Sequence, residues 1–153
     1  MPKTLDLEQT YTECVTGGSI LPQDKVDIHK IQSMLPIIEE YMKSAEDMKA
    51  KNSFNVRYDL AYSALHMLTE AFLLFDEVEI ASHQCLFAAL CIRHPELDLD
   101  WNFFEKIRMK REGIHHGAAI RREDWVEIDI QSKLYAKTLS QALKEKISQH
   151  KRG

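Results

Sequence analysis

The stretch that decides the fold covers residues 57–75 and reads RYDLAYSALHMLTEAFLLF. Its apolar residues recur at steps of three and four, which places them on one face of a helix. This stripe predicts a long amphipathic helix packed against a core, and Asn52 or Ser53 is suited to cap its start. The members of the stripe are Leu60, Ala61, Ala64, Leu68, Ala71 and Phe75.

Helical patterns also occur before and after this stretch. Pro36 falls inside the first of them and is expected to kink that helix or split it in two. Pro95 ends another, and Gly113 and Gly117 weaken the end of a helix that starts near Trp101. The expected helices besides the one already described cover residues 24–50, residues 80–93, the segment from residue 101 toward these glycines, and residues 123–148.

Taken together, these patterns predict an all-α fold, a four- to five-helix up-and-down bundle with short loops. No segment has a convincing strand pattern. Residues 1–23 are poorly periodic and end in turn-forming residues, so we expect an N-terminal arm there and a bundle domain over residues 24–150.

Composition excludes several classes of protein. The chain has 153 residues, 44% hydrophobic and 29% charged, which is typical of one globular domain. No apolar run is long enough to span a membrane, and the first residues lack the apolar core of a secretion signal. The three cysteines are odd in number and have no CxxC spacing, so a cytoplasmic location is expected.

The charge of −4 is unevenly distributed along the chain. Between residues 105 and 122, six Lys or Arg and two Glu give a local charge of +4, which leaves −8 for the rest. A basic patch on an acidic body can bind a phosphodiester at one site. The candidate RNA-binding residues in this window are Lys106, Lys110, Arg121 and Arg122.

Arg111 lies on an apolar helical face. At 100° per residue from Ile107, Phe103 falls near −40°, Phe104 near 60° and Ile114 near −20°, with Arg111 near 40° between them. A guanidinium keeps its charge, so on this face it needs a partner, a cleft or an interface. An arginine that reaches solvent or pairs with a buried carboxylate is the structural alternative.

Two histidines follow this arginine. In a regular helix His115 lies about 40° from Arg111 and His116 about 140° from it, whereas unwinding at Gly113 turns His116 toward Arg111. A neutral histidine can take the proton of a ribose 2′-hydroxyl while arginine stabilises charge on the phosphate oxygens. Histidines at a helix end can equally be favoured by the helix dipole alone.

The chain resembles the HEPN superfamily, the higher-eukaryote and prokaryote nucleotide-binding domain. The resemblance rests on the helix of residues 57–71, on Ser82-His83 and Leu86-Phe87, and on an arginine followed after four residues by histidine and glycine. The last of these is formed by Arg111, His116 and Gly117. The similarity covers roughly residues 25–150.

This resemblance implies a helical bundle that forms a symmetric homodimer, with the two motifs meeting at the interface. Many members are metal-independent endoribonucleases, often toxins or RNA-processing proteins, and in them the motif residues corresponding to Arg111 and His116 are catalytic. No cofactor and no metal are expected. The alternative is a non-catalytic module that binds RNA or a nucleotide, or a nucleotidyltransferase antitoxin partner.

Several neighbouring residues are supporting candidates. Glu112 stands where the family often has Asn, Asp or His. Ala118 stands where some toxins have a tyrosine that a partner nucleotidyltransferase adenylylates. Arg108 and His115 form a second possible motif with six residues between them. On residues 57–75 a polar ridge is either solvated surface or turned toward the motif, and its members are Asp59, Ser63, His66 and Glu70.

Overall fold

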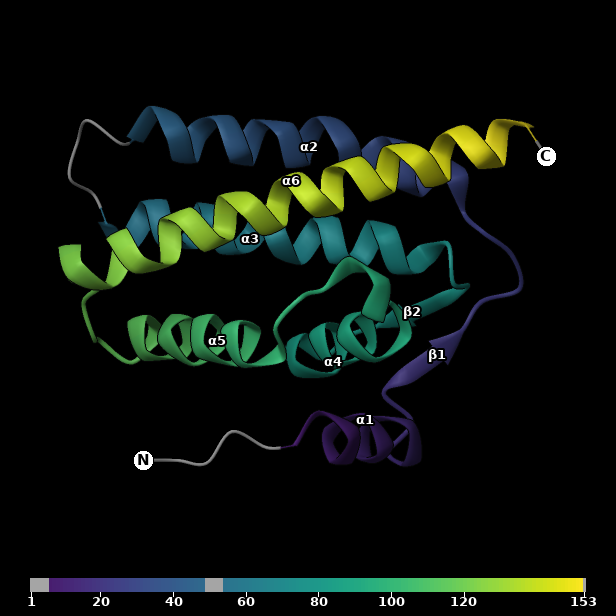
Figure 1. Cartoon of the computed structure of the whole chain (residues 1–153), viewed down its shortest axis with the longest axis horizontal. Coiled ribbons are helices and arrows are strands. Elements are labelled where there is room, and N and C mark those ends of the chain that lie inside the picture. The colour runs from purple at the N-terminus through teal and green to yellow at the C-terminus, as the bar shows by residue number, and fades with distance from the viewer. Residues whose placement is uncertain (1–5, 49–53, 153) are drawn as a thin grey trace.

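The computed structural model describes residues 6–48 and 54–152. In this part the chain forms six α-helices, one pair of short strands and a 3₁₀ turn, so the predicted all-α helical bundle is confirmed (Figure 1). In chain order the elements are α1 (Leu7–Thr16), β1 (Ile20–Pro22), α2 (Ile28–Asp47), α3 (Phe54–Leu74), β2 (Val78–Ile80), α4 (His83–Arg93), η2 (Pro95–Leu97), α5 (Trp101–His115) and α6 (Arg122–Arg152).

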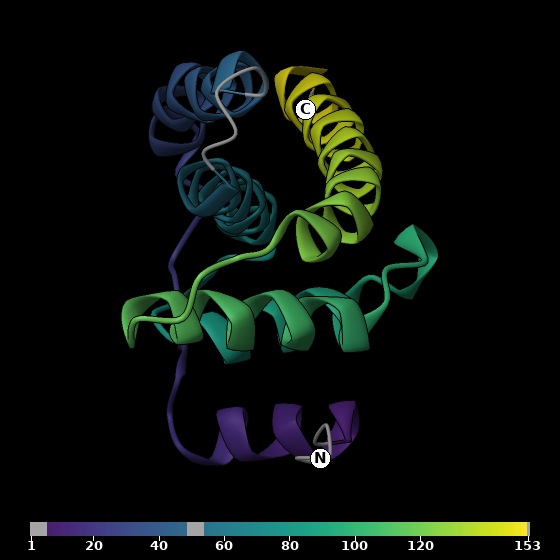
Figure 2. The same ribbon diagram turned by 90° about the vertical axis from the view of Figure 1, so that its left-hand side faces the viewer.

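Helix α3 is the centre of the bundle. It packs against α2 and α6 on one side and against α4 and α5 on the other. Figures 1 and 2 show this order, with α1 lying beyond α4 and α5. The predicted stripe is buried at Ala64, Leu68 and Ala71, but burial continues around the helix to Tyr62 and Phe72 because helices cover both of its sides.

Helix α2 is continuous through Pro36. Of the two outcomes expected at Pro36, the split is therefore wrong, and the residues on both sides of it pack into the core through Ile31 and Ile38. The helix starts at Ile28 rather than at residue 24, since the Asp27 side chain accepts a hydrogen bond from the Lys30 amide at 3.1 Å. The expected caps of α3, Asn52 and Ser53, lie outside the described residues.

The N-terminal segment contains regular structure that the sequence analysis did not predict. Helix α1 packs on α4, and β1 pairs antiparallel with β2, with Ile20 opposite Ile80. The expectation of no strand is wrong here, and the helix expected from residue 80 begins at His83 instead. Val78 and Ile80 are buried while Glu79 between them is exposed, an alternation too short to stand out from the neighbouring helices.

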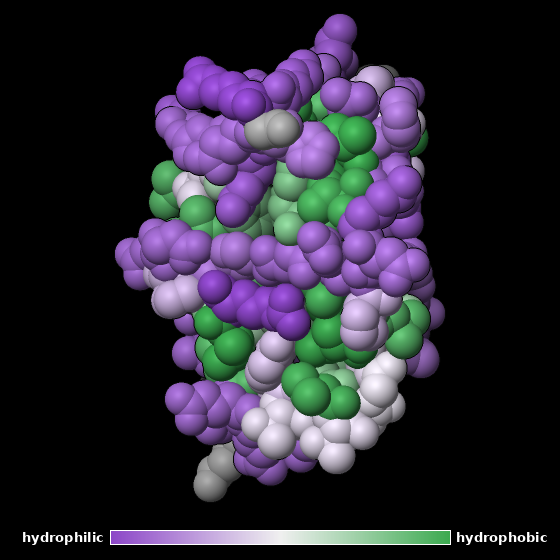
Figure 3. All heavy atoms as spheres, turned by 90° about the vertical axis from the view of Figure 1, so that its right-hand side faces the viewer, coloured by the Kyte–Doolittle hydropathy of each residue, from purple (hydrophilic) through white to green (hydrophobic). Residues whose placement is uncertain are grey.

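A disulfide joins Cys14 of α1 to Cys85 of α4, and the third cysteine, Cys91, is buried and free. Disulfides persist mainly in oxidising compartments, so the cytoplasmic location stays a prediction. In the described part of the chain no helix combines the length and apolarity needed to cross a membrane. Polar side chains cover most of one end of the molecule, with apolar patches between them (Figure 3).

A buried histidine joins the end of α4 to the end of α3. His94 Nε2 lies 2.7 Å from Asp76 Oδ2 and its Nδ1 lies 2.9 Å from Glu96 Oε1, while Arg93 Nη1 lies 3.7 Å from the same Asp76 oxygen. The ring also meets the edge of Phe72 at 4.6 Å between centroids. The hydrogen bond with Asp76 is the main reason that the pKa of His94 is raised.

We expect this histidine to stabilise the fold most at acidic pH. Its folded-state pKa lies above the unfolded value of about 6.5, so its contribution is complete below about pH 6.5 and is lost as the pH rises through the raised pKa. In urea denaturation, the difference in free energy of unfolding between the wild type and His94→Gln should therefore shrink as the pH rises from 5 toward 9. A difference that stays constant over this range would contradict the prediction.

Candidate functional site

A pocket of about 390 Å³ opens between α3, the start of α4 and the second half of α5. It brings together residues that are up to 53 positions apart in the sequence, from Tyr62 to His115. Two arginines, two histidines and one tyrosine give it a mixed polar and aromatic lining. The residues that line it are Tyr62, Ser82, His83, Gln84, Arg108, Arg111, Glu112 and His115.

Arg111 lies between a carboxylate and an aromatic ring of α3. Its Nε donates to Asp59 Oδ1 at 3.3 Å, and its guanidinium carbon lies 4.9 Å from the centre of the Tyr62 ring. The side chain remains 29% exposed, so it is accessible from the pocket. Arg111 thus has both a carboxylate partner and a cleft, and the ring holds the planar guanidinium by cation–π attraction.

The second arginine of the pocket is held by a buried acid. Arg108 Nε and Nη2 donate to the two carboxylate oxygens of Glu105 at 2.9 and 3.1 Å, and Gln84 Nε2 also donates to Glu105 at 3.1 Å. Glu105 is only 4% exposed. Such a bidentate pair fixes the arginine's plane. Sequence reasoning did not identify Glu105 or Gln84, because their contact joins two different helices across 21 positions of sequence.

The end of α5 decides which histidine faces the pocket. The Gly117 amide donates to the Ile114 carbonyl at 3.0 Å and the Ala118 amide to the Gly113 carbonyl at 2.9 Å, which is a Schellman ending. It requires a positive φ at the residue after the cap, and Gly117 has φ +94°. The helix therefore stays regular through Gly113, and the unwinding that would turn His116 toward Arg111 is absent.

His115 consequently lines the pocket with Arg111, whereas His116 is the exposed C-cap of α5 and is not among the lining residues. The regular-helix geometry, about 40° against about 140° from Arg111, accounts for this difference. Within one copy of the chain, Arg108 and His115, the motif pair with six residues between its members, thus both line the pocket. Of the pair with four residues between its members, Arg111 lines the pocket and His116 does not.

A further histidine, on α4, completes the pocket. His83 Nδ1 is hydrogen-bonded to the Tyr62 hydroxyl at 2.9 Å, and its ring lies 3.9 Å from the His66 ring. Burial, together with the nearby His66 and Arg111, lowers the pKa of His83 to about 4. Burial also raises the pKa of Tyr62 to about 12. Both groups are therefore neutral at pH 7, and Tyr62 keeps its proton.

The polar ridge of α3 faces the motif at one end and extends to the neighbouring helix at the other. Asp59 contacts Arg111, as described above. His66 contacts His83 of α4 and pairs through Nδ1 with Glu70 Oε1 at 2.9 Å. The ridge is therefore more than solvated surface, because its side chains position the cation and the imidazole that border the pocket.

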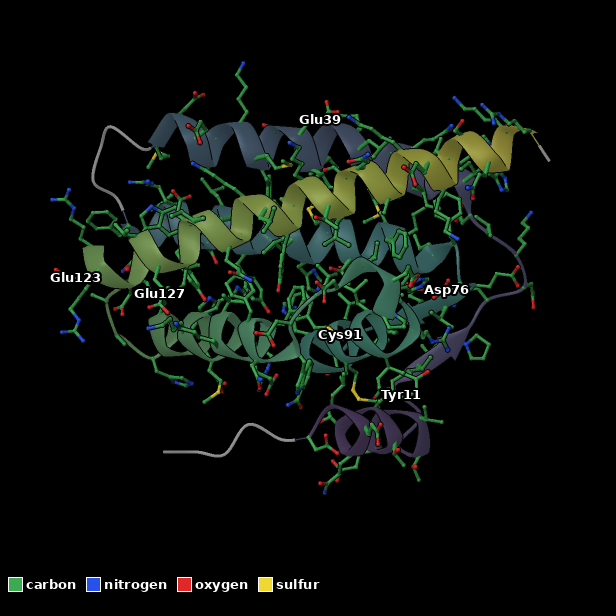
Figure 4. The ribbon with its side chains drawn as sticks, viewed as in Figure 1. Tyr11, Glu39, Asp76, Cys91, Glu123 and Glu127 are labelled. Carbon is green, nitrogen blue, oxygen red and sulfur yellow. A yellow bond between two sulfur atoms is a disulfide. The ribbon has the colours of Figure 1, made fainter. Side chains whose placement is uncertain are left out.

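The predicted RNA-binding lysines point elsewhere. Lys106 pairs with Glu127, and Lys110 Nζ lies 3.3 Å from Asp124 Oδ1, so both tie α5 to the start of α6. Figure 4 shows Glu127 at this end of α6. Arg121 is 81% exposed and, like the exposed Arg122, lies outside the pocket lining. These four side chains do not gather at the pocket.

Over residues 6–48 and 54–152, no three His, Cys, Asp or Glu side chains are arranged to hold a metal ion. Cys85, which forms part of a His-x-Cys pair with His83, is committed to the disulfide. No protein-family model, curated protein or solved structure matches the chain.

Proposed function

We propose that this pocket binds a phosphodiester of RNA and that the chain is a metal-independent endoribonuclease. The observation that supports the proposal best is that Arg111, His115 and the neutral His83 border one pocket. A guanidinium and neutral imidazoles are the groups that transfer of an RNA phosphoryl group needs when no metal takes part. The resemblance to the HEPN superfamily points to the same chemistry, and a toxin or RNA-processing role in the cytoplasm belongs to this proposal.

Each group has a defined task in this mechanism. The His115 imidazole accepts the proton of the ribose 2′-hydroxyl as that oxygen attacks phosphorus. The bond from phosphorus to the 5′-oxygen then breaks, which leaves a 2′,3′-cyclic phosphate and, once that oxygen is protonated, a 5′-hydroxyl. Arg111 binds the developing negative charge. Its Nε is used by Asp59, and within the described residues neither Nη group has a hydrogen-bond partner, so both are available to phosphate oxygens.

His83 acts as a neutral hydrogen-bond donor in this proposal. With Tyr62 protonated and donating to Nδ1, the proton of the imidazole is on Nε2. Nε2 can then donate to a phosphate oxygen without a change of charge. A histidine with a pKa of about 4 is a weak base at pH 7, which is why we assign the base to His115 instead.

His116 has a different place in the proposal. It is exposed at the end of α5, so it reaches a phosphate only if a second copy of the chain lies against the pocket. The symmetric homodimer implied by the family resemblance would supply such a copy. Substitutions of His115 and His116 therefore distinguish a site built within one chain from a composite site built by two chains.

We expect the purified chain to cleave single-stranded RNA in the presence of a metal chelator. His115→Ala should slow cleavage by about 10²-fold or more, since a positioned base contributes roughly that factor. His116→Ala should match the wild type if one chain forms the site, and should slow cleavage as strongly if two chains form it. The products and rates are followed by gel electrophoresis. Cleavage that the chelator abolishes, or that survives both substitutions, would overturn the proposal.

One observation favours the alternative, a module that binds RNA or a nucleotide without cleaving it, or a nucleotidyltransferase partner. The acids Asp59, Glu105 and Glu112 lie at or beside the two pocket arginines, and they offset the cationic charge that a phosphate would meet. This hypothesis predicts RNA binding in a filter assay without turnover. Neutralising Arg108 to Gln should then weaken binding, and Lys151→Gln, at an exposed site near the end of α6, should not.

A further inference from the structure

A second hollow lies between α2 and α6, above α3. It has a volume of about 460 Å³ and shares no residue with the pocket at Arg111. Figure 2 shows α2 and α6 lying next to each other above α3. The bottom of the hollow, its floor, is apolar and well packed, because Ile38 of α2, Leu68 of α3 and Leu143 of α6 are each at most 2% exposed. We call this hollow the α2–α6 groove.

Small side chains create the groove. Helix α3 presents Ala61 and Ala64 to it, and α6 presents Ser132, Ala136 and Ser140. Leucines at these positions would fill the space between two helices that both rest on α3. The hollow is thus built into the residue types and lies within the range of about 300–1,000 Å³ typical of ligand pockets.

The two walls of the groove carry opposite charges. Helix α6 contributes Lys133, Lys137 and Lys144, and α2 contributes Glu39 and Glu46. Lys133 bridges the walls, since its Nζ lies 3.3 Å from Glu46 Oε2 and 3.3 Å from Asp129 Oδ2. Within the described residues Lys137 and Lys144 form no ion pair. Within the described residues, the α6 wall therefore carries two ammonium groups that form no ion pair. The α2 wall carries one carboxylate that forms none, that of Glu39.

We propose that the α2–α6 groove binds a long-chain aliphatic carboxylate, a free fatty acid. The acyl chain lies along the apolar floor, where each buried methylene contributes about 0.8 kcal/mol in water-to-apolar transfer. The carboxylate meets Lys137 and Lys144 at the rim, where it remains hydrated. An aliphatic alcohol fits the floor equally well but gains nothing from the lysines, and an aliphatic amine is repelled by them. This activity is separate from RNA cleavage and does not depend on it.

The test titrates the full-length protein with sodium dodecanoate, dodecanol and dodecylamine, each below its aggregation concentration. Trp125 lines the groove, so its fluorescence reports occupancy, and calorimetry gives the affinity. Dodecanoate should bind at least tenfold more tightly than either of the other two. The double substitution Lys137→Glu with Lys144→Glu should remove this preference. Lys151→Glu, at an exposed position outside the groove, is the matched control.

A second variant separates the floor from the rim. Ala61 is half-buried and lines the groove, so Ala61→Phe should fill it and weaken all three ligands together. If that variant fails to fold, the charge variant still decides the question. Equal binding of the three ligands, or none, would overturn the proposal. So would sedimentation as a dimer that Ala61→Phe converts to a monomer, because a second copy of the chain would then be the occupant.

Discussion

Replacing Arg111 with Ala should slow RNA cleavage by about 10²–10³-fold, the usual effect of removing one group that stabilises charge in the transition state. The loss should appear in kcat and kcat/KM alike if the guanidinium binds the phosphate more tightly as charge develops on it. Stability should change little. The pair between Arg111 and Asp59 is partly exposed, at 29% and 51%, and such a pair contributes about 1 kcal/mol or less to the free energy of unfolding.

Two further variants make this prediction specific. Arg111→Lys keeps the charge but loses the planar fork that contacts the Tyr62 ring and Asp59, so it should recover only a small part of the rate. Arg121→Ala removes a cation that is 81% exposed and outside the pocket, and should cleave RNA at nearly the wild-type rate. If Arg111→Ala and Arg121→Ala behave alike, the pocket is not the site of cleavage.

The sequence predicts which faces of the helices are apolar better than it predicts which helices meet. The stripe on α3 and the weak end of α5 are local features, and both are confirmed: α3 is buried along Ala64, Leu68 and Ala71, and α5 ends just before Gly117. The need of Arg111 for a partner also followed from its place on an apolar face. The identity of that partner, Asp59, did not, because 52 residues separate the two.

The parts that the sequence did not predict depend on contacts between distant segments. Helix α1 is only ten residues long, its buried residues are Thr10 and Cys14, and it is held by α4 and by the disulfide. The environment of His83 is likewise set by Tyr62 and His66 of another helix. Helical periodicity gives the direction of a side chain around the axis of its own helix. It carries no information about which residues of another helix lie opposite that side chain.

The disulfide leads to the largest expected effect on stability. It closes a loop across 71 positions of sequence, and constraining the unfolded chain over such a loop contributes about 4 kcal/mol by the chain-entropy model. Cys14→Ser should therefore lower the free energy of unfolding by roughly that amount, measured by urea denaturation without reductant. Dithiothreitol should lower the wild type to nearly the same stability and leave Cys14→Ser unchanged.

The control is Cys91→Ser, which removes the buried free thiol and leaves the disulfide in place. This variant should keep the full response to dithiothreitol, because reduction acts on Cys14 and Cys85 alone. Since Arg93 Nε still donates to the Tyr11 hydroxyl at 3.0 Å and β1 still pairs with β2, α1 should stay docked in the reduced protein below its melting temperature. Hydrogen exchange in residues 7–16 that stays slow on reduction would agree with this expectation. A wild-type urea midpoint that dithiothreitol does not move would contradict a stabilising role for the disulfide.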